Sequence, residues 1–119
     1  MAAPNLYAIT SVVARTTYAT ATTTYANILT NGSSSGQAYK LNTILASNYT
    51  SVPSDVSVAI FRSGNTWTIA SNVVVPDSAT VIIMTKDTNI YMEESDSLQI
   101  RSNTASSVNV TASYEVLGP

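Results

Sequence analysis

The chain contains no cysteine and no histidine. Without cysteine it forms no disulfide bonds and offers no thiolate ligands to a metal. Without histidine it lacks the most frequent catalytic base and the commonest metal ligand of proteins. Because these two absences together close most routes to catalysis, we expect a protein that is not an enzyme, with no catalytic residues, no metal ligands and no cofactor.

Charged side chains are also scarce, at 10% of the residues, compared with about 25% in ordinary soluble domains. The net charge is −2 and the five basic residues are scattered singly. This argues against a nucleic-acid partner, because phosphate neutralisation needs clustered Lys and Arg. No apolar run approaches the roughly 20 residues that span a bilayer, so we predict no membrane partner. The first residues lack the basic and apolar regions of a signal peptide, which indicates synthesis in a cytoplasm.

Hydroxyl side chains supply the polarity instead, with 17 Ser and 17 Thr among 119 residues. Thr and short apolar side chains suit the pleated, half-buried surface of a sheet, so this composition favours β structure. A chain of this length is expected to form one domain with a buried core.

Apolar residues alternate in short runs that are bounded by turn residues, as is typical of strands. In one clear case, Val56, Val58 and Ile60 should lie on one face. About nine short strands at this spacing predict an all-β fold, an antiparallel β-sandwich of either jelly-roll or immunoglobulin-like topology. The predicted strands span residues 5–13, 15–30 with a break near Ala21, 37–47, 56–62, 67–75, 81–87, 89–92, 97–102 and 108–117.

Several local features carry more specific expectations. The turn "NGSSSG" (31–36) should join segments 22–30 and 37–47 in a hairpin. In the second segment we expect Tyr39 and Leu41 to point inward, with Leu45 as a further candidate. Trp67 opens its strand and should cover one end of the core. The continuously apolar segment 81–87 should be covered on both faces.

The densest acidic patch is Glu93, Glu94 and Asp96. It lies between two predicted strands, so we interpret it as a solvated turn. A calcium site would use these carboxylates with Asp87, but the segment lacks the glycine and the closing glutamate of an EF-hand loop. A glycosidase pair is disfavoured because adjacent Glu93 and Glu94 point in opposite directions in an extended chain.

Tyrosines are concentrated in the first half of the chain, and tyrosine is enriched both in β cores and at protein interfaces. We therefore expect a core or subunit-interface role ahead of sugar stacking. Residues 1–20, rich in Ala, Thr and Tyr, are a candidate arm that adds a strand to the sheet edge of a neighbouring subunit. The predicted interface residues are Leu6, Tyr7, Ile9, Tyr18 and Tyr25.

From residue 38 onward the order of elements resembles small virion structural proteins of tailed phages, especially those infecting aquatic bacteria such as cyanobacteria. The matching segments are "AYKLNTILASN", "VSVAIFR", "WTIASNVVVPDSATVIIMTKDTNIYMEESDSLQIRS" and "VTASYEVL". Such proteins commonly have Gly where this chain has Ser95. The difference leads us to expect a turn that does not require a strictly positive φ.

The resemblance implies a β-sandwich present in many copies on a virion, with a capsid decoration (cement) protein as the leading hypothesis. Its partners would be the major capsid protein or other virion proteins and its own copies, as a trimer or hexamer. It would be made in the cytoplasm of a bacterial host. A neck, tail or baseplate subunit remains an alternative, as does a carbohydrate-binding adhesin module that uses exposed Tyr and Trp67. A calcium-dependent hydrolase is the least favoured.

Overall fold

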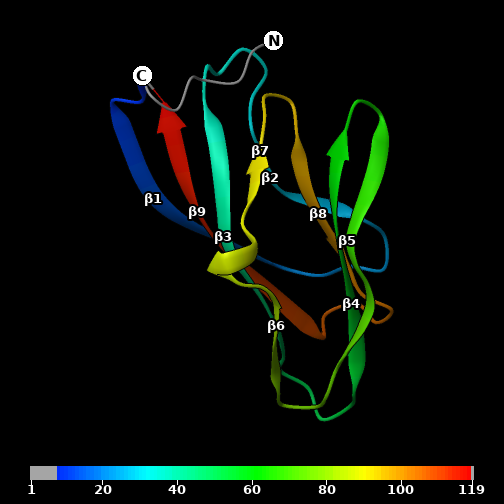
Figure 1. The fold of residues 1–119 in the computed structure, drawn as a ribbon. Helices are drawn as coiled ribbons and strands as arrows, with labels where there is room; N and C mark the ends of the chain where they lie inside the picture. The colour runs from blue at the N-terminus through cyan, green and yellow to red at the C-terminus, as the bar shows by residue number, and fades with distance from the viewer. Residues whose placement is uncertain (1–7, 119) are drawn as a thin grey trace.

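The computed structural model describes residues 8–118, which form two antiparallel sheets packed face to face (Figure 1). A short 3₁₀ helix, η2 (Lys86–Thr88), precedes β7. The predicted all-β antiparallel sandwich of about nine strands is confirmed. The strands are β1 (Ser11–Thr20), β2 (Ala26–Thr30), β3 (Ala38–Asn48), β4 (Ser54–Arg62), β5 (Asn65–Val75), β6 (Thr80–Met84), β7 (Ile90–Met92), β8 (Ser97–Arg101) and β9 (Val108–Gly118).

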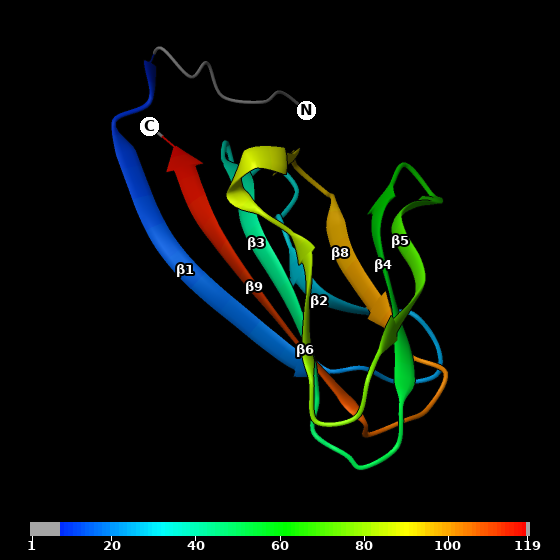
Figure 2. The same ribbon diagram turned by 60° about the horizontal axis from the view of Figure 1, so that its bottom comes forward.

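Sheet I has the strand order β1-β9-β3-β6, with β7 also pairing with β3, and sheet II has the order β2-β8-β4-β5 (Figure 2). Strands β6 and β7 pair with successive parts of β3, so they are two halves of one strand that η2 interrupts. Counted in this way, eight strands form two four-stranded sheets, and successive strands lie in opposite sheets except for the β4–β5 hairpin within sheet II. That is the arrangement of a jelly roll and differs from the immunoglobulin order.

The predicted hairpin between segments 22–30 and 37–47 is wrong. Strand β2 pairs with β8 in sheet II, and β3 pairs with β9 in sheet I. The turn at 31–36 therefore carries the chain from one sheet to the other. Of the two glycines in this turn, Gly36 has a positive φ of 68° and Gly32 does not. The pairing partners are selected by burial of the two apolar faces against each other.

The core lies between the sheets and follows the predicted alternation. Val56, Val58 and Ile60 of β4 are buried, and so are Leu98 and Ile100 of β8. On the opposite face, sheet I contributes buried residues from β3 and β9, including Leu41, Ile44, Val108, Val110 and Ala112. The inward-facing residues of β4 and β8 are thus predicted correctly by the period of two.

A bulge changes the pattern in β3. Leu41 pairs with Tyr114 and Thr43 pairs with Ser113, which leaves Asn42 as an extra residue. Because one extra residue reverses the alternation beyond it, Ile44 is fully buried while Leu45 is only partly buried. Leu41 and the partly buried Tyr39 are on the predicted inner face, but the expectation for Leu45 is wrong.

The segment 81–87 also differs from its prediction. Strand β6 ends at Met84, and η2 occupies residues 86–88. Ile82 is 60% exposed, so the segment is not covered on both faces. An edge position in sheet I, with only β3 as a neighbour, explains why its outer face remains open to solvent.

The N-terminal segment forms the other edge of sheet I, shown in blue in Figure 1. Strand β1 pairs with β9 of the same chain at all ten residues from Ser11 to Thr20. The predicted break near Ala21 is confirmed, since β1 ends at Thr20 and β2 begins at Ala26. Of the predicted strand 5–13, residues 8–10 are described but belong to no strand, since β1 begins at Ser11. Residues 1–7, which begin the proposed arm 1–20, lie outside the described residues.

Candidate functional site

The acidic patch is not a solvated turn. Residues 93–96 connect β7 to β8, and Glu94 and Asp96 are only 4% and 1% exposed. Buried carboxylates require hydrogen-bond donors or a positive partner, because the charged form loses its hydration. The prediction is therefore wrong, and the partners of these carboxylates define what the turn does.

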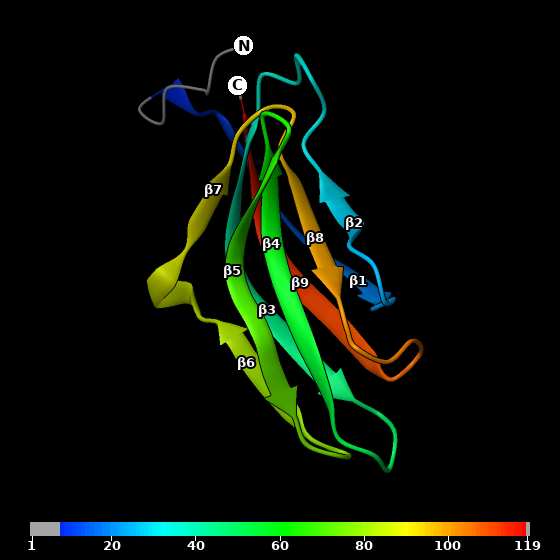
Figure 3. The ribbon, with the colours of Figure 1, turned by 90° about the vertical axis from the view of Figure 1, so that its right-hand side faces the viewer.

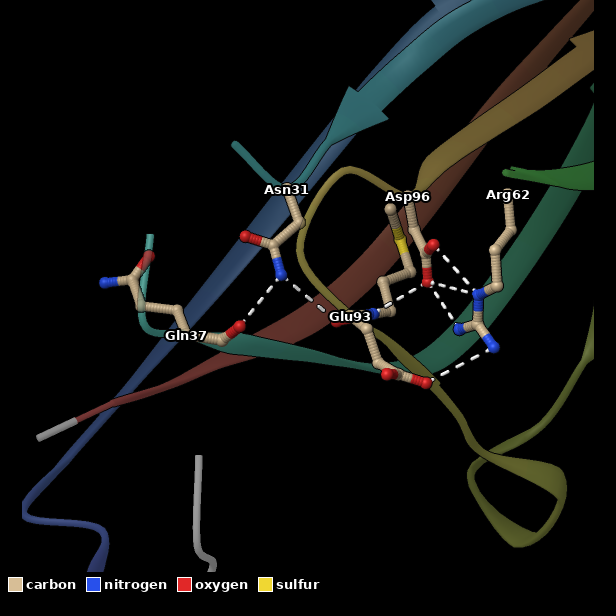
Figure 4. Close-up of polar contacts among 6 residues, drawn as sticks. Asn31, Gln37, Arg62, Glu93 and Asp96 are labelled. Carbon is tan, nitrogen blue, oxygen red and sulfur yellow. Dashed lines mark hydrogen bonds and ion pairs between the residues drawn. The ribbon is translucent and has the colours of Figure 1, made fainter. Parts of the chain in front are cut away.

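Asp96 is held by the β4 residue Arg62 (Figure 4). Arg62 Nε lies 2.9 and 3.0 Å from the two Asp96 carboxylate oxygens, and Nη2 donates to Oδ2. The same Oδ2 accepts the backbone N–H of Glu93 at 2.8 Å, which closes the turn on itself. The forked geometry matches the planar guanidinium and is the strong form of an Arg–carboxylate pair.

Arg62 also contacts Glu93, with 3.3 Å between Nη1 and Oε2. The hydrogen bond to Asp96, reinforced by the charges of Asp96 and Glu93, raises the pKa of the Arg62 guanidinium. The cation therefore stays charged, and the cluster works as a fixed ion pair. Arg62 itself neither gives up nor accepts a proton, because an arginine side chain stays protonated in proteins.

Hydrogen bonds also join the turn at residues 93–96 to the "NGSSSG" turn at residues 31–36. Asn31 is fully buried and donates from Nδ2 to the carbonyls of Gln37 (2.9 Å) and Met92 (3.2 Å) (Figure 4). Glu94 accepts the backbone N–H of Gly36 at 2.7 Å. Two backbone bonds between Asn31 and residues 95 and 96 complete the connection. One end of the sandwich is thus closed by two crossover turns that hold each other.

Ser95 has φ 71°. The expectation that this turn avoids positive φ is wrong, because Ser95 occupies the left-handed region that glycine adopts most easily. Its backbone N–H donates to the Asn31 carbonyl at 2.8 Å, so the conformation is fixed by the same contact between turns.

At the end of the sandwich away from these two turns, buried serine hydroxyls form hydrogen bonds with one another. Ser54, Ser102 and Ser107 are buried and hydrogen-bond one another, with oxygen–oxygen distances of 2.9 and 3.1 Å. Nearby, buried Asn48 donates to the carbonyls of Val52 and Val75. These three serines therefore stabilise the structure by hydrogen bonds between segments that are far apart in the sequence.

Among residues 8–118, no group of three or more His, Cys, Asp or Glu side chains could hold a metal ion. Asp87, the suggested fourth calcium ligand, lies in η2 and is exposed. In the same described range, no helix has the length and apolar character needed to cross a bilayer.

The structure describes three of the five predicted interface residues, Ile9, Tyr18 and Tyr25. Tyr18 is 78% exposed on β1, Ile9 is partly buried, and Leu6 and Tyr7 lie outside the described residues. Tyr25 is partly buried, and its ring lies 5.3 Å from the Arg101 guanidinium carbon. Of the other early tyrosines, Tyr39 packs against Tyr114 with 5.3 Å between ring centroids, and Tyr49 donates its hydroxyl proton to the Ser106 carbonyl.

The outer edge of β1 is an open backbone surface. Its pairing with β9 runs for ten residues without a register shift. In the described part of the chain no strand pairs with its other side. Val12, Val13 and Tyr18 are exposed along it, and Arg15 is its single charged residue.

A cleft of about 500 Å³ lies at the other side of the sandwich, between the β4–β5 hairpin and β7. Figure 3 views this side, with β4 and β5 toward the reader. Its walls include Ile60, Arg62, Trp67, Ile69, Ile90 and Tyr91. Trp67 is 61% exposed, so the prediction that it covers the end of the core is wrong, although it lies beside the core.

No protein-family model matches the chain, and no curated protein matches it.

Proposed function

We propose that the chain is a non-enzymatic structural protein of a tailed-phage virion, a capsid decoration protein that acts through subunit contacts. The observation that carries the proposal is the long, regular and open edge of β1. The jelly roll is a fold of viral capsid domains. That likeness is an analogy, because folds host many functions.

The other sheet edges are blunted in ways that natural proteins use against edge pairing. Strand β2 is short and contains a register shift between Asn27 and Leu29. The pairing of β5 with β4 shifts register twice, with Asn72 at φ 50°. The third edge is divided between β6 and β7. Strand β1 has no comparable interruption, so it is the edge best suited to accept a strand.

The partner that fits this edge most simply is β1 of a second copy. Two identical antiparallel strands can pair across a twofold axis, and such a contact is self-complementary. Low charge favours the contact, since little desolvation of charged groups is required. Twofold pairing of β1 produces even-numbered assemblies, so of the two oligomers expected from the sequence it favours a hexamer over a trimer.

Sedimentation velocity over a range of protein concentrations tests the proposal. We expect an even-numbered oligomer for the unaltered chain. The double variant Val12→Lys/Tyr18→Lys should halve the size of the oligomer, from dimer to monomer or from hexamer to trimer, because it places like charges along both copies of the paired edge. Both side chains are exposed, so the variant should keep its fold and melting temperature.

The matched control is Val74→Lys/Ile82→Lys, which replaces two equally exposed apolar residues on the β5 and β6 side. It should assemble like the unaltered chain. A monomeric unaltered chain at all concentrations, or assembly lost in the control and retained in the β1 variant, would contradict the proposed contact.

The position within the virion is a separate question. Adjacent genes test it: a neighbouring major capsid gene supports decoration of the shell, whereas a neighbouring tail or baseplate gene supports the alternative. Mass spectrometry of the purified particle, before and after separation of heads from tails, gives the same distinction directly.

A further inference from the structure

Trp67 points toward the interior of the sandwich and is nevertheless exposed. It lies directly opposite Ile60 in the β4–β5 ladder, and directly opposite residues share one face of a sheet. Ile60 is buried in the core, so this face is the inner one. From sheet I, the β7 residues Ile90 and Tyr91 line the cleft beside Trp67. The core is therefore left open at Trp67, whose indole ring forms part of the wall of the cleft.

The cleft has one apolar end and one polar end. Ile60, Ile69 and Ile90 contribute the apolar end. The polar end is the β4–β5 turn, where Asn65 lies opposite Arg62. Ser63 and Gly64 both have positive φ, 54° and 79°, which is the signature of a tight two-residue turn of fixed geometry. Side chains two residues apart on a strand, such as Asn65 and Trp67, stand about 7 Å apart on the same face.

The polar end has hydrogen-bonding capacity without net positive charge. Asp96 and Glu93 engage three of the five N–H groups of Arg62, through Nε, Nη1 and Nη2. Two donors of Arg62 remain, and the lining of the cleft adds the amide of Asn65 and the hydroxyls of Ser63 and Thr68. Two carboxylates outnumber the single guanidinium, so the cluster has no net positive charge and an anionic ligand gains little here.

We propose that this cleft binds a neutral saccharide. A sugar ring has an apolar face that packs on an aromatic ring and a rim of hydroxyls that both donate and accept hydrogen bonds. Trp67 and Tyr91 supply aromatic surface, and Asn65 with Arg62 supplies amide and guanidinium groups at one end. The volume of about 500 Å³ lies in the range of small-ligand sites. The site is on the opposite side of the molecule from β1, so it can act independently of assembly.

Trp67 is the single tryptophan of the chain, so its fluorescence reports on this cleft alone. The experiment titrates the purified protein with neutral oligosaccharides of glucose, galactose, mannose and N-acetylglucosamine. We expect a saturable change in emission, and reduced quenching by acrylamide, with at least one of them. Asn65→Ala retains the fluorophore and should weaken the apparent affinity about three- to tenfold, as for loss of a hydrogen bond.

Trp67→Ala, followed by NMR chemical-shift changes, should weaken binding about tenfold. Tyr18→Ala removes an exposed aromatic ring at the β1 edge and should leave the affinity unchanged. Three results would overturn the inference: no saturable response to any of the neutral sugars, tighter binding of sulfated than of neutral forms, or an emission shift that depends on protein concentration alone. The last result would identify the cleft as a contact between copies.

Discussion

Arg62 on β4 and Asp96 in the turn between β7 and β8 form a forked ion pair in which the carboxylate is almost fully buried. The pair joins sheet II to a chain segment that crosses from sheet I. Since Asp96 also accepts the backbone N–H of Glu93, one side chain fixes both the turn and its attachment. The acidic patch, which looks like a candidate metal site in the sequence, is thus a structural clamp at one end of the sandwich.

Replacing the clamp carboxylate should destabilise the fold. Asp96→Asn retains the shape of the side chain but loses the charged hydrogen bonds to Arg62, and we expect a loss of about 2 kcal/mol in the free energy of unfolding. Urea unfolding measures it. Asp87→Asn, which alters an exposed carboxylate in η2, serves as the control and should change stability little. Equal effects of the two substitutions would refute the clamp.

Asn31 should be the most sensitive amide in the two linked turns. Asn31→Ala leaves the carbonyls of Gln37 and Met92 without their donor, and we expect a cost of about 1 to 3 kcal/mol. Asn89→Ala removes an exposed amide with a single local bond to Lys86 and should cost much less. Chemical denaturation of both variants provides the comparison, and a cost for Asn31→Ala no larger than that for Asn89→Ala would argue against this contact.

Ser95→Gly should stabilise the protein. Ser95 is exposed at φ 71°, where glycine avoids a steric cost, and we expect a gain of about 0.5 to 1 kcal/mol. Ser51→Gly, at an exposed position without positive φ, should instead be neutral or destabilising. It relieves no strain in the folded state and increases the conformational entropy of the unfolded chain. Melting temperatures measured side by side show whether each substitution raises or lowers stability. A lower melting temperature for Ser95→Gly would contradict a steric cost at the positive φ of Ser95.

Alkaline stability should depend on Tyr114. Burial, together with the neighbouring Tyr39, raises the pKa of the Tyr114 hydroxyl. The folded state thus holds this proton more tightly than the unfolded chain, whose tyrosine pKa is about 10. The stabilising contribution is present below that pH and is lost as the pH rises through the folded-state pKa.

Tyr114→Phe removes this contribution, so its stability relative to the unaltered chain should improve between about pH 9 and about pH 11. Urea unfolding at both pH values measures the difference. Tyr18→Phe, at an exposed hydroxyl, is the matched control and should show no such trend. If the stability difference between Tyr114→Phe and the unaltered chain stays constant with pH, ionisation of Tyr114 does not affect folding stability and the prediction is wrong.

Local alternation was sufficient to predict the sandwich and much of its core. Val56, Val58 and Ile60 are buried as predicted, because a period of two directly encodes which face of a strand is inward. The break after Thr20 was also visible, in a segment of Thr and Ala with little apolar content.

Pairing and polar burial were not predictable in the same way. The hairpin error at residues 31–36 arose because a turn sequence specifies a bend and not the strand that lies beside it. Glu94 and Asp96 looked solvated because their partners, Gly36 and Arg62, are distant in sequence. A further clue was present in the sequence: Arg62 directly precedes a Ser-Gly turn, which fixes its position at the tip of a hairpin. Trp67 is predicted to cover one end of the core, but it is exposed beside the short strand β7, and alternation does not reveal the length of a neighbouring strand.

Hydrogen–deuterium exchange of the β1 amides tests the central claim, assembly through this edge, most directly. In a paired edge, the amides of Ser11–Thr20 that point away from β9 become hydrogen-bonded. We predict that these amides gain protection as the protein concentration rises, and that Val12→Lys/Tyr18→Lys abolishes the gain. Exchange in β1 that stays equally fast in the monomer and in the assembled protein would contradict it.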